Sequence, residues 1–143
     1  MIILEKVYKK IFESFPVPPP EQGGIIGIKN GVVCEYYHDA SCDVTNSLVY
    51  VPDVLLLNKI IQDWEERQIQ FAGIVHSHPI GQESLSSGDK EYIQLVFDSL
   101  PEHINKLFFP IVIPAQNTMF CYVAEKSEEK IVIEICECKI ASS

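Results

Sequence analysis

The apolar run FAGIV at residues 71–75 constrains the fold most, because it lies between two segments with helical periodicity. A continuous apolar run of this kind is typical of a strand that is buried on both faces of a sheet. Residues 54–68 before it and residues 90–100 after it place apolar side chains three and four positions apart. A buried strand between two amphipathic helices predicts an α/β fold.

Two segments at the start of the chain also have clear local patterns. The segment 4–15 has apolar residues at helical spacing, and Pro16 ends the helix that this spacing predicts. Residues 25–37 contain two apolar segments joined by Asn30 and Gly31, the dipeptide that most strongly predicts a two-residue hairpin turn. The chain is therefore expected to begin with a helix followed by a β-hairpin.

The C-terminal third is predicted to consist mainly of strands. Strand patterns occupy residues 106–113, 119–125 and 130–140, and the charged turn KSEE joins the last two. Residues 47–51 have a strand pattern as well. We therefore predict a single domain over residues 1–143, with an α/β fold: a curved mixed β-sheet with an N-terminal hairpin and a C-terminal meander, flanked by three helices.

Charge and hydropathy exclude several classes of protein. Twenty acidic and eleven basic residues give a net charge of −9, which repels phosphate backbones, so we expect no nucleic-acid partner. No stretch approaches the roughly 18 uncharged residues that a membrane-spanning helix needs, so we expect a cytoplasmic protein without a membrane partner. The cysteines are odd in number and lack CxxC spacing, so we expect reduced, mostly buried thiols. They are Cys34, Cys42, Cys121, Cys136 and Cys138.

Two histidines follow the central strand directly. His76 and His78 are two residues apart, so the alternation of a strand projects both imidazoles from the same face. Pro79 then fixes the direction in which the chain leaves the strand, and a short loop containing Gly81 leads to the next helix. Two imidazoles that converge on one point are typical of a metal site.

Ser86 and Asp89 stand at the start of that helix. Ser86 is a natural N-cap, and Asp89 lies in the first turn, from which its carboxylate can reach back to the end of the strand. His76, His78 and Asp89 would then form a three-ligand set with one open position, as catalytic zinc sites do.

A purely structural interpretation of the same residues is also available. Ser86 and Asp89 resemble a capping box with Asp in place of Glu, and a His-x-His motif alone often occurs without a metal. The combined spacing is far more specific than either part. The zincin, serine hydrolase and nucleotide-binding signatures HExxH, GxSxG and GxxxxGK[ST] are absent, so the sequence offers no competing site of these kinds.

The combined pattern resembles that of a known family. The segment His76-Ser77-His78-Pro79, followed by Ser86 and Asp89 at this spacing, is similar to the signature of the JAMM metalloproteases, also called MPN-plus domains. That family also has a glutamate at the start of an upstream strand, and Glu21 in PEQGGIIG matches it. The compact length resembles that of prokaryotic-type, stand-alone JAB domains.

The resemblance implies the MPN fold and a role for each matched residue. His76, His78 and Asp89 would bind one Zn²⁺ per chain, with water as the fourth ligand. Glu21 would accept a proton from that water and return it to the leaving amine, and Ser86 would donate a hydrogen bond to the oxyanion.

Three functions remain open on the sequence. The first is a zinc-dependent, deubiquitinase-like isopeptidase or peptidase that cleaves at the C-terminus of a ubiquitin-like modifier. The modifier's tail would lie as an added strand between residues 43–52 and the strand before His76. The second is removal of a C-terminal cysteine or short peptide from a sulfur-carrier protein. Conjugation or sulfur-transfer enzymes encoded in the same operon would be the partners that distinguish these two. The third is a non-catalytic MPN scaffold.

Overall fold

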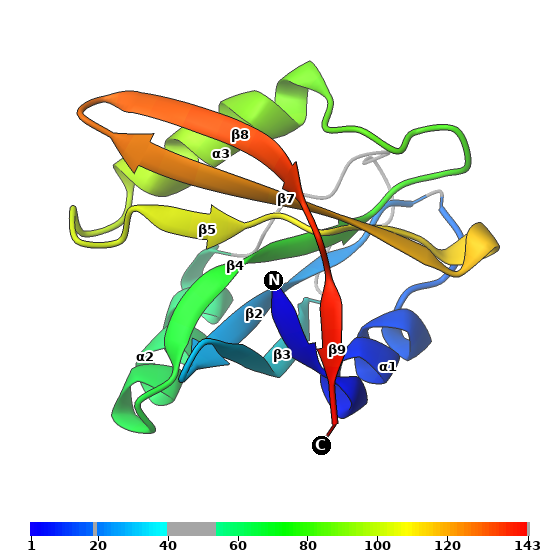
Figure 1. Cartoon of the computed structure of the whole chain (residues 1–143), viewed down its shortest axis with the longest axis horizontal. Helices are drawn as coiled ribbons and strands as arrows, with labels where there is room; N and C mark the ends of the chain where they lie inside the picture. The colour runs from blue at the N-terminus through cyan, green and yellow to red at the C-terminus, as the bar shows by residue number, and fades with distance from the viewer. Residues whose placement is uncertain (19, 40–53, 143) are drawn as a thin grey trace.

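The computed structural model describes residues 1–18, 20–39 and 54–142, which form one nine-stranded sheet and three α-helices (Figure 1). The helices are α1 (Glu5–Ser14), α2 (Val54–Glu66) and α3 (Ser87–Asp98), and a short 3-10 helix, η1, covers Pro114–Gln116. The strands are β1 (Ile2–Leu4), β2 (Gly23–Lys29), β3 (Val32–Asp39), β4 (Gln70–Ser77), β5 (Lys106–Phe108), β6 (Ile111–Ile113), β7 (Thr118–Ser127), β8 (Lys130–Cys136) and β9 (Lys139–Ala141). No helix among these residues is long and apolar enough to cross a membrane.

Strand β4 lies in the middle of the sheet and is paired along both edges. On one side β2 runs antiparallel to it, with Gly23 opposite His76. On the other side β6 runs parallel to it, with Ile111 opposite His76, and β5 pairs with it at Gly73. All residues from 71 to 78 are buried. The FAGIV run is thus the buried central strand that its composition predicts.

Two-residue turns close two hairpins of the sheet. Asn30 and Gly31 join β2 to β3 with φ values of 53° and 79°, and Glu128 and Glu129 join β7 to β8 with φ values of 54° and 94°. Two consecutive positive φ angles are characteristic of the type I′ turn, whose twist matches that of the flanking strands. The predicted N-terminal hairpin is confirmed, and β6, β7 and β8 form the predicted C-terminal meander.

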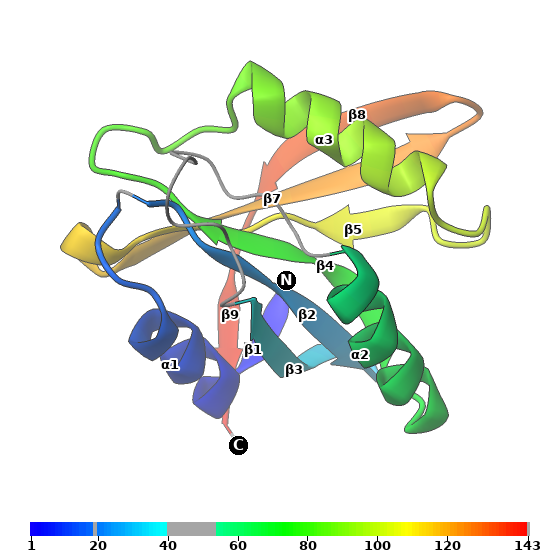
Figure 2. The same ribbon diagram turned by 180° about the vertical axis from the view of Figure 1, so that it is seen from behind.

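The helices cover both faces of the sheet, as Figures 1 and 2 show from opposite sides. Consecutive residues of a strand point to opposite faces, so Ile25 and Ile74 pack toward α2 and α3, whereas Ile26 and Val75 pack toward α1. The helical residues buried on these faces are Leu57, Trp64, Ile93 and Phe97 on the first and Val7 and Ile11 on the second, where Phe15, just after α1, joins them. The mixed sheet and three flanking helices confirm the predicted fold class.

The structure departs from the sequence-based prediction at the edges of the sheet. The predicted strand 106–113 is two short strands, separated at Phe109-Pro110, because proline cannot donate a hydrogen bond to a neighbouring strand. The predicted strand 130–140 ends at Cys136, and β9 instead runs parallel to β1. Strand β1 was not predicted, because its three residues form a strand only through these distant partners. The predicted strand 47–51 lies outside the described residues.

Gly73 is the glycine on which the centre of the sheet depends. It has φ of +148°, and a Cβ atom there would overlap the backbone carbonyl of Phe108 on β5. Gly31 in the first hairpin turn also has positive φ, but a Cβ there would meet nothing within 4 Å. Substituting alanine at each of these two glycines therefore separates the free-energy cost of backbone conformation from the cost of a steric clash.

We expect Gly73→Ala to destabilise the fold much more than Gly31→Ala. Gly31→Ala carries only the conformational cost of a left-handed residue, about 1–2 kcal/mol. Gly73→Ala adds a clash with backbone that cannot move without breaking the β4–β5 pairing, so its loss should exceed about 4 kcal/mol. Urea unfolding of both variants beside the wild type measures the two losses. Equal losses would mean that β5 does not approach β4 as closely as described.

Candidate metal centre

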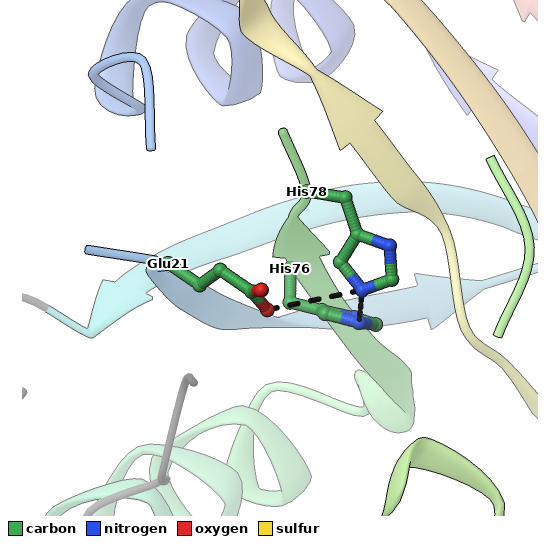
Figure 3. A group of neighbouring side chains, drawn as sticks. All are labelled: Glu21, His76 and His78. Carbon is green, nitrogen blue, oxygen red and sulfur yellow. Dashed lines mark hydrogen bonds and ion pairs between the residues drawn. The ribbon is translucent and has the colours of Figure 1, made fainter. Parts of the chain in front are cut away.

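Four of the predicted site residues come together from three separate segments. His76 and His78 project from the end of β4, Asp89 lies in the first turn of α3, and Glu21 lies just before β2. Figure 3 shows the Glu21 carboxylate pointing toward the two imidazole rings. The antiparallel pairing of Gly23 with His76 brings the start of β2 beside the end of β4, which is why residues 55 positions apart in the chain meet.

The nitrogen and oxygen atoms of this group converge at metal-ligand distances. The Nε2 atoms of His76 and His78 lie 2.8 Å apart, and each lies 3.3 Å from an oxygen of the Asp89 carboxylate. Ligand atoms bound at about 2.0–2.1 Å to a tetrahedral Zn²⁺ lie roughly 3.3 Å from one another. The two histidine–aspartate distances have this length but run to different oxygens of the carboxylate, Oδ1 for His76 and Oδ2 for His78. The histidine–histidine distance is shorter than this spacing by about 0.5 Å.

Hydrogen bonds fix the orientation and the tautomer of His78. Its Nδ1 donates to the carbonyl oxygen of Gln82 at 2.8 Å, which leaves the lone pair on Nε2 facing the cluster. Its backbone N–H donates to the Val112 carbonyl at 2.9 Å, and that of His76 donates to the Pro110 carbonyl at 3.2 Å. The end of β4 is therefore held in place by the segment that carries β6.

Ser86 and Asp89 form the predicted capping box at the start of α3. The Asp89 backbone N–H donates to Ser86 Oγ at 3.0 Å, and the Ser86 backbone N–H donates to Asp89 Oδ2 at 2.8 Å. The second bond holds the carboxylate in the orientation in which it faces both histidines. Because Ser86 Oγ accepts in the first bond, its own hydrogen remains available to a group outside the helix.

Glu21 is positioned through its neighbour Gln22. The Gln22 backbone N–H donates to Ser77 Oγ at 2.9 Å, and the Ser77 backbone N–H donates to the Gln22 carbonyl at the same distance. His38 Nε2 donates to the Gln22 side-chain oxygen at 2.8 Å. These contacts fix the segment before β2, and they leave Glu21 Oε1 3.8 Å from His78 Nε2.

Burial gives the two carboxylates different electrostatic properties. Burial raises the pKa of Glu21, and the charge of His78 only partly offsets this effect. Burial also favours the neutral form of Asp89, but hydrogen bonds with His76 and His78 outweigh it and hold the pKa of Asp89 well below its usual range. Asp89 therefore stays ionised, whereas the raised pKa makes Glu21 a stronger proton acceptor than an exposed glutamate.

The two imidazoles also differ. Burial lowers the pKa of His76. Burial acts in the same direction on His78, but its hydrogen bonds with Asp89 and the Gln82 carbonyl outweigh this effect and raise its pKa. Two buried imidazoles facing an ionised carboxylate form a nitrogen and oxygen donor set that suits Zn²⁺. Ligand atoms of Glu21, His76 and His78 also lie within 4.8 Å of one another, so two carboxylates are in reach of the same position.

Sequence reasoning missed the residues that support these side chains. Ser77 lies between the two histidines and faces the other side of β4, a position that the period of two does indicate. The role of the Gln82 carbonyl has no signal in the sequence, because any residue supplies a carbonyl. His38 is half-buried and bonded to Gln22, whereas its polar sequence context suggests an exposed residue.

Comparisons with known proteins bear on the fold. No protein-family model matches the sequence, and no curated protein matches it. The solution structure of DSY2949 from Desulfitobacterium hafniense aligns with a TM-score of 0.63 and 16% identity, over 100% of this chain and 93% of that chain. AF2198, a JAB1/MPN domain protein from Archaeoglobus fulgidus, aligns with a TM-score of 0.52 and 17% identity, over 98% of each chain. A structure described as a JAMM metalloprotease-like zinc site in the proteasome and signalosome aligns with a TM-score of 0.49 and 17% identity, over 99% of this chain and 97% of that chain.

The similarity to AF2198 extends over the whole sheet and its helices, at an identity that speaks to the fold alone. The positions of Glu21, His76 and His78 within that fold come from the geometry of this chain. The chain therefore has the JAB1/MPN fold, and its cluster of Glu21, His76 and His78 fits the JAMM metalloprotease motif.

Proposed function

We propose that the protein is a zinc-dependent peptidase of the JAMM type that hydrolyses an amide bond at the C-terminus of a ubiquitin-like modifier. The observation that carries this proposal is the convergence of His76, His78 and Asp89 at 3.3 Å or less, with Glu21 beside them. A non-catalytic MPN scaffold would not need two imidazoles and two carboxylates buried together. Burying ionisable side chains costs free energy unless they pair with one another or bind a metal.

Asp89 is the third protein ligand in this proposal, and Glu21 is not a ligand. Asp89 lies 3.3 Å from both Nε2 atoms and stays ionised, as a ligand must. Glu21 lies 3.8 Å from His78, and burial raises its pKa, which suits a group that accepts and returns a proton. The difference in environment assigns the two carboxylates to different roles.

The residues would divide the chemistry among them. Zn²⁺, when bound, polarises a carbonyl group and lowers the pKa of water toward about 7. Glu21 would accept the proton of the attacking water and deliver it to the leaving amine nitrogen. The Ser86 hydroxyl would donate a hydrogen bond to the carbonyl oxygen as that oxygen gains negative charge.

We assign an apolar groove on the α2 and α3 side of the sheet to a protein substrate; its lining contains none of the metal-site residues. The groove, of about 290 Å³, lies between α2 and α3 and includes Ile74, two residues before His76 on the same face of β4. Leu95 on its wall is 63% exposed. Because both edges of β4 are paired, that strand cannot accept the modifier's tail as an added strand. The other expected wall, residues 43–52, lies outside the described residues.

We predict one tightly bound zinc per chain, which His78→Ala and Asp89→Asn abolish and Glu21→Gln retains. The first two changes remove a ligand, whereas the third removes only a proton acceptor. Elemental analysis of the purified proteins after dialysis measures the metal. His103→Ala, which changes an exposed histidine, is the matched control. Zinc that survives in Asp89→Asn but not in Glu21→Gln would reverse the roles of the two carboxylates, and no zinc in the wild type would contradict the hydrolase proposal.

We expect Glu21→Gln to lower the rate of cleavage by about 10²–10⁴-fold while zinc is retained, because it removes the proton acceptor. Glu83→Gln, the same change at an exposed carboxylate of the loop before α3, should leave the rate unchanged. The assay uses isopeptide-linked and linear fusions of a ubiquitin-like modifier, and a sulfur-carrier protein with a C-terminal extension. Cleavage of the sulfur-carrier substrate alone would redirect the proposal to that class.

Ser86→Gly tests whether the hydroxyl acts beyond the helix cap. Glycine is almost as good an N-cap as serine, so stability should fall by only a few tenths of a kcal/mol. Loss of the oxyanion donor should lower kcat by about 10²–10³-fold. Ser86→Thr keeps the hydroxyl and should restore most of the activity. A Ser86→Gly protein with the wild-type kcat would mean that Ser86 serves the helix alone.

A further inference from the structure

A second chemically distinctive group lies on the meander, away from the metal-site residues. Cys121 on β7 and Cys136 on β8 are directly opposite each other in the antiparallel pairing, and their Sγ atoms lie 3.1 Å apart. Directly opposite residues of antiparallel strands have Cα atoms about 4.5–5.5 Å apart, within the range that a disulfide spans. A disulfide bond is about 2.05 Å long, so the sulfur atoms need to approach by only about 1 Å.

The two thiols differ in their access to solvent. Cys121 is buried, at 2% exposure, and burial together with the neighbouring Cys136 raises its pKa. Cys136 is only partly buried, and β8 pairs with no strand other than β7 in the described part of the chain. A small oxidant therefore reaches Cys136 before Cys121, whose sulfur lies 3.1 Å from that of Cys136.

We propose that Cys121 and Cys136 are a redox-active pair that forms a reversible disulfide on exposure to a hydroperoxide. The Cys136 thiolate attacks the peroxide oxygen, the O–O bond breaks, and Cys136 becomes a sulfenic acid as one water or alcohol leaves. The Cys121 sulfur then attacks the sulfenic sulfur, the S–O bond breaks and a second water leaves. Two thiols lose two electrons and two protons in all, and the peroxide is reduced. A small-molecule dithiol reverses the reaction by exchange.

Cys138 is the competing partner. It lies beyond the end of β8, is partly buried, and is close enough for its charge to contribute to the raised pKa of Cys121. It has no register partner on β7, whereas Cys136 faces Cys121 directly. Cys34 lies on β3, which pairs with β2 and β1 and not with the meander. The sequence predicts reduced, mostly buried thiols; of the four described cysteines, Cys121 is buried and the other three are partly buried.

The disulfide would crosslink β7 and β8, the two longest strands of the meander, at the end where β7 pairs with β6. Phe120, next to Cys121, pairs with Ile111 on β6, and β8 ends at Cys136 before the chain continues to β9. A crosslink between residues 121 and 136 restricts the unfolded chain, so the oxidised protein should unfold at a higher temperature than the reduced one.

The test uses the full chain with Cys34→Ser and Cys42→Ser, which leaves three of its five cysteines. The reduced protein is treated with hydrogen peroxide, free thiols are counted under denaturing conditions, and crosslinked peptides are identified by mass spectrometry. Cleavage after Glu137 places Cys136 and Cys138 on different peptides. We expect the thiol count to fall from three to one, a crosslink between Cys121 and Cys136, a raised Tm, and full reversal by dithiothreitol.

Matched variants make the result specific. Cys138→Ser should still form the crosslink, whereas Cys136→Ser, a change at a partly exposed position, should abolish both the crosslink and the rise in Tm. Three thiols that persist after peroxide, a crosslink from Cys121 to Cys138, or sulfinic acid at Cys136 without a crosslink would each overturn the proposal. Zinc content and cleavage by reduced Cys136→Ser should equal those of the wild type, so failure here is distinct from failure of the proposed peptidase activity.

Discussion

The two-sided pairing of β4 is the constraint on which the rest of the structure depends. Hydrogen bonds to β2 on one side and to β5 and β6 on the other hold the strand along its length, including its last residues. The same pairing holds His76 and His78, which project from one face of β4 toward α3. The same pairing with β2 brings Glu21 to the histidines, because the segment before Gly23 runs beside the end of β4. A site with these demands on geometry needs a rigid scaffold of this kind.

The capping box shows why structural and functional interpretations of one motif need not compete. The bond from the Ser86 backbone N–H to Asp89 Oδ2 satisfies the first turn of α3 and also aims the carboxylate at both imidazoles. The bond from the Asp89 backbone N–H uses Ser86 Oγ as an acceptor and leaves its hydrogen for another group. A helix start placed after a short loop thus supplies an oriented carboxylate and a hydrogen-bond donor together. Either function alone would select the same two residue types.

Local signals predicted most of this fold and most of the candidate site. The apolar run of β4, the Asn30-Gly31 turn and the Ser86 cap each depend on neighbouring residues, and each is where its pattern indicates. The features that could not be predicted depend on distant pairings. Strands β1 and β9 are too short to have a pattern of their own. The clamp of Gln22 by Ser77 and the opposition of Cys121 to Cys136 require the register of strands that only the folded sheet defines.

Among the described residues, the histidine and carboxylate cluster at the end of β4 and the thiols of Cys121 and Cys136 both carry atoms that bind zinc, and their chemistry differs. Thiolates are strong zinc ligands, but Cys121 and Cys136 offer only two sulfur atoms, and burial disfavours the thiolate of Cys121. A stable tetrahedral site needs three or four protein ligands that lose their protons at little cost. Asp89 is already ionised and burial favours the neutral form of His76, so these two ligands meet the requirement. His78 directs its Nε2 lone pair at the cluster, although its raised pKa adds a cost to its deprotonation. The metal is therefore expected at the end of β4. The pair of Cys121 and Cys136 suits disulfide formation, which needs two sulfur atoms and no metal.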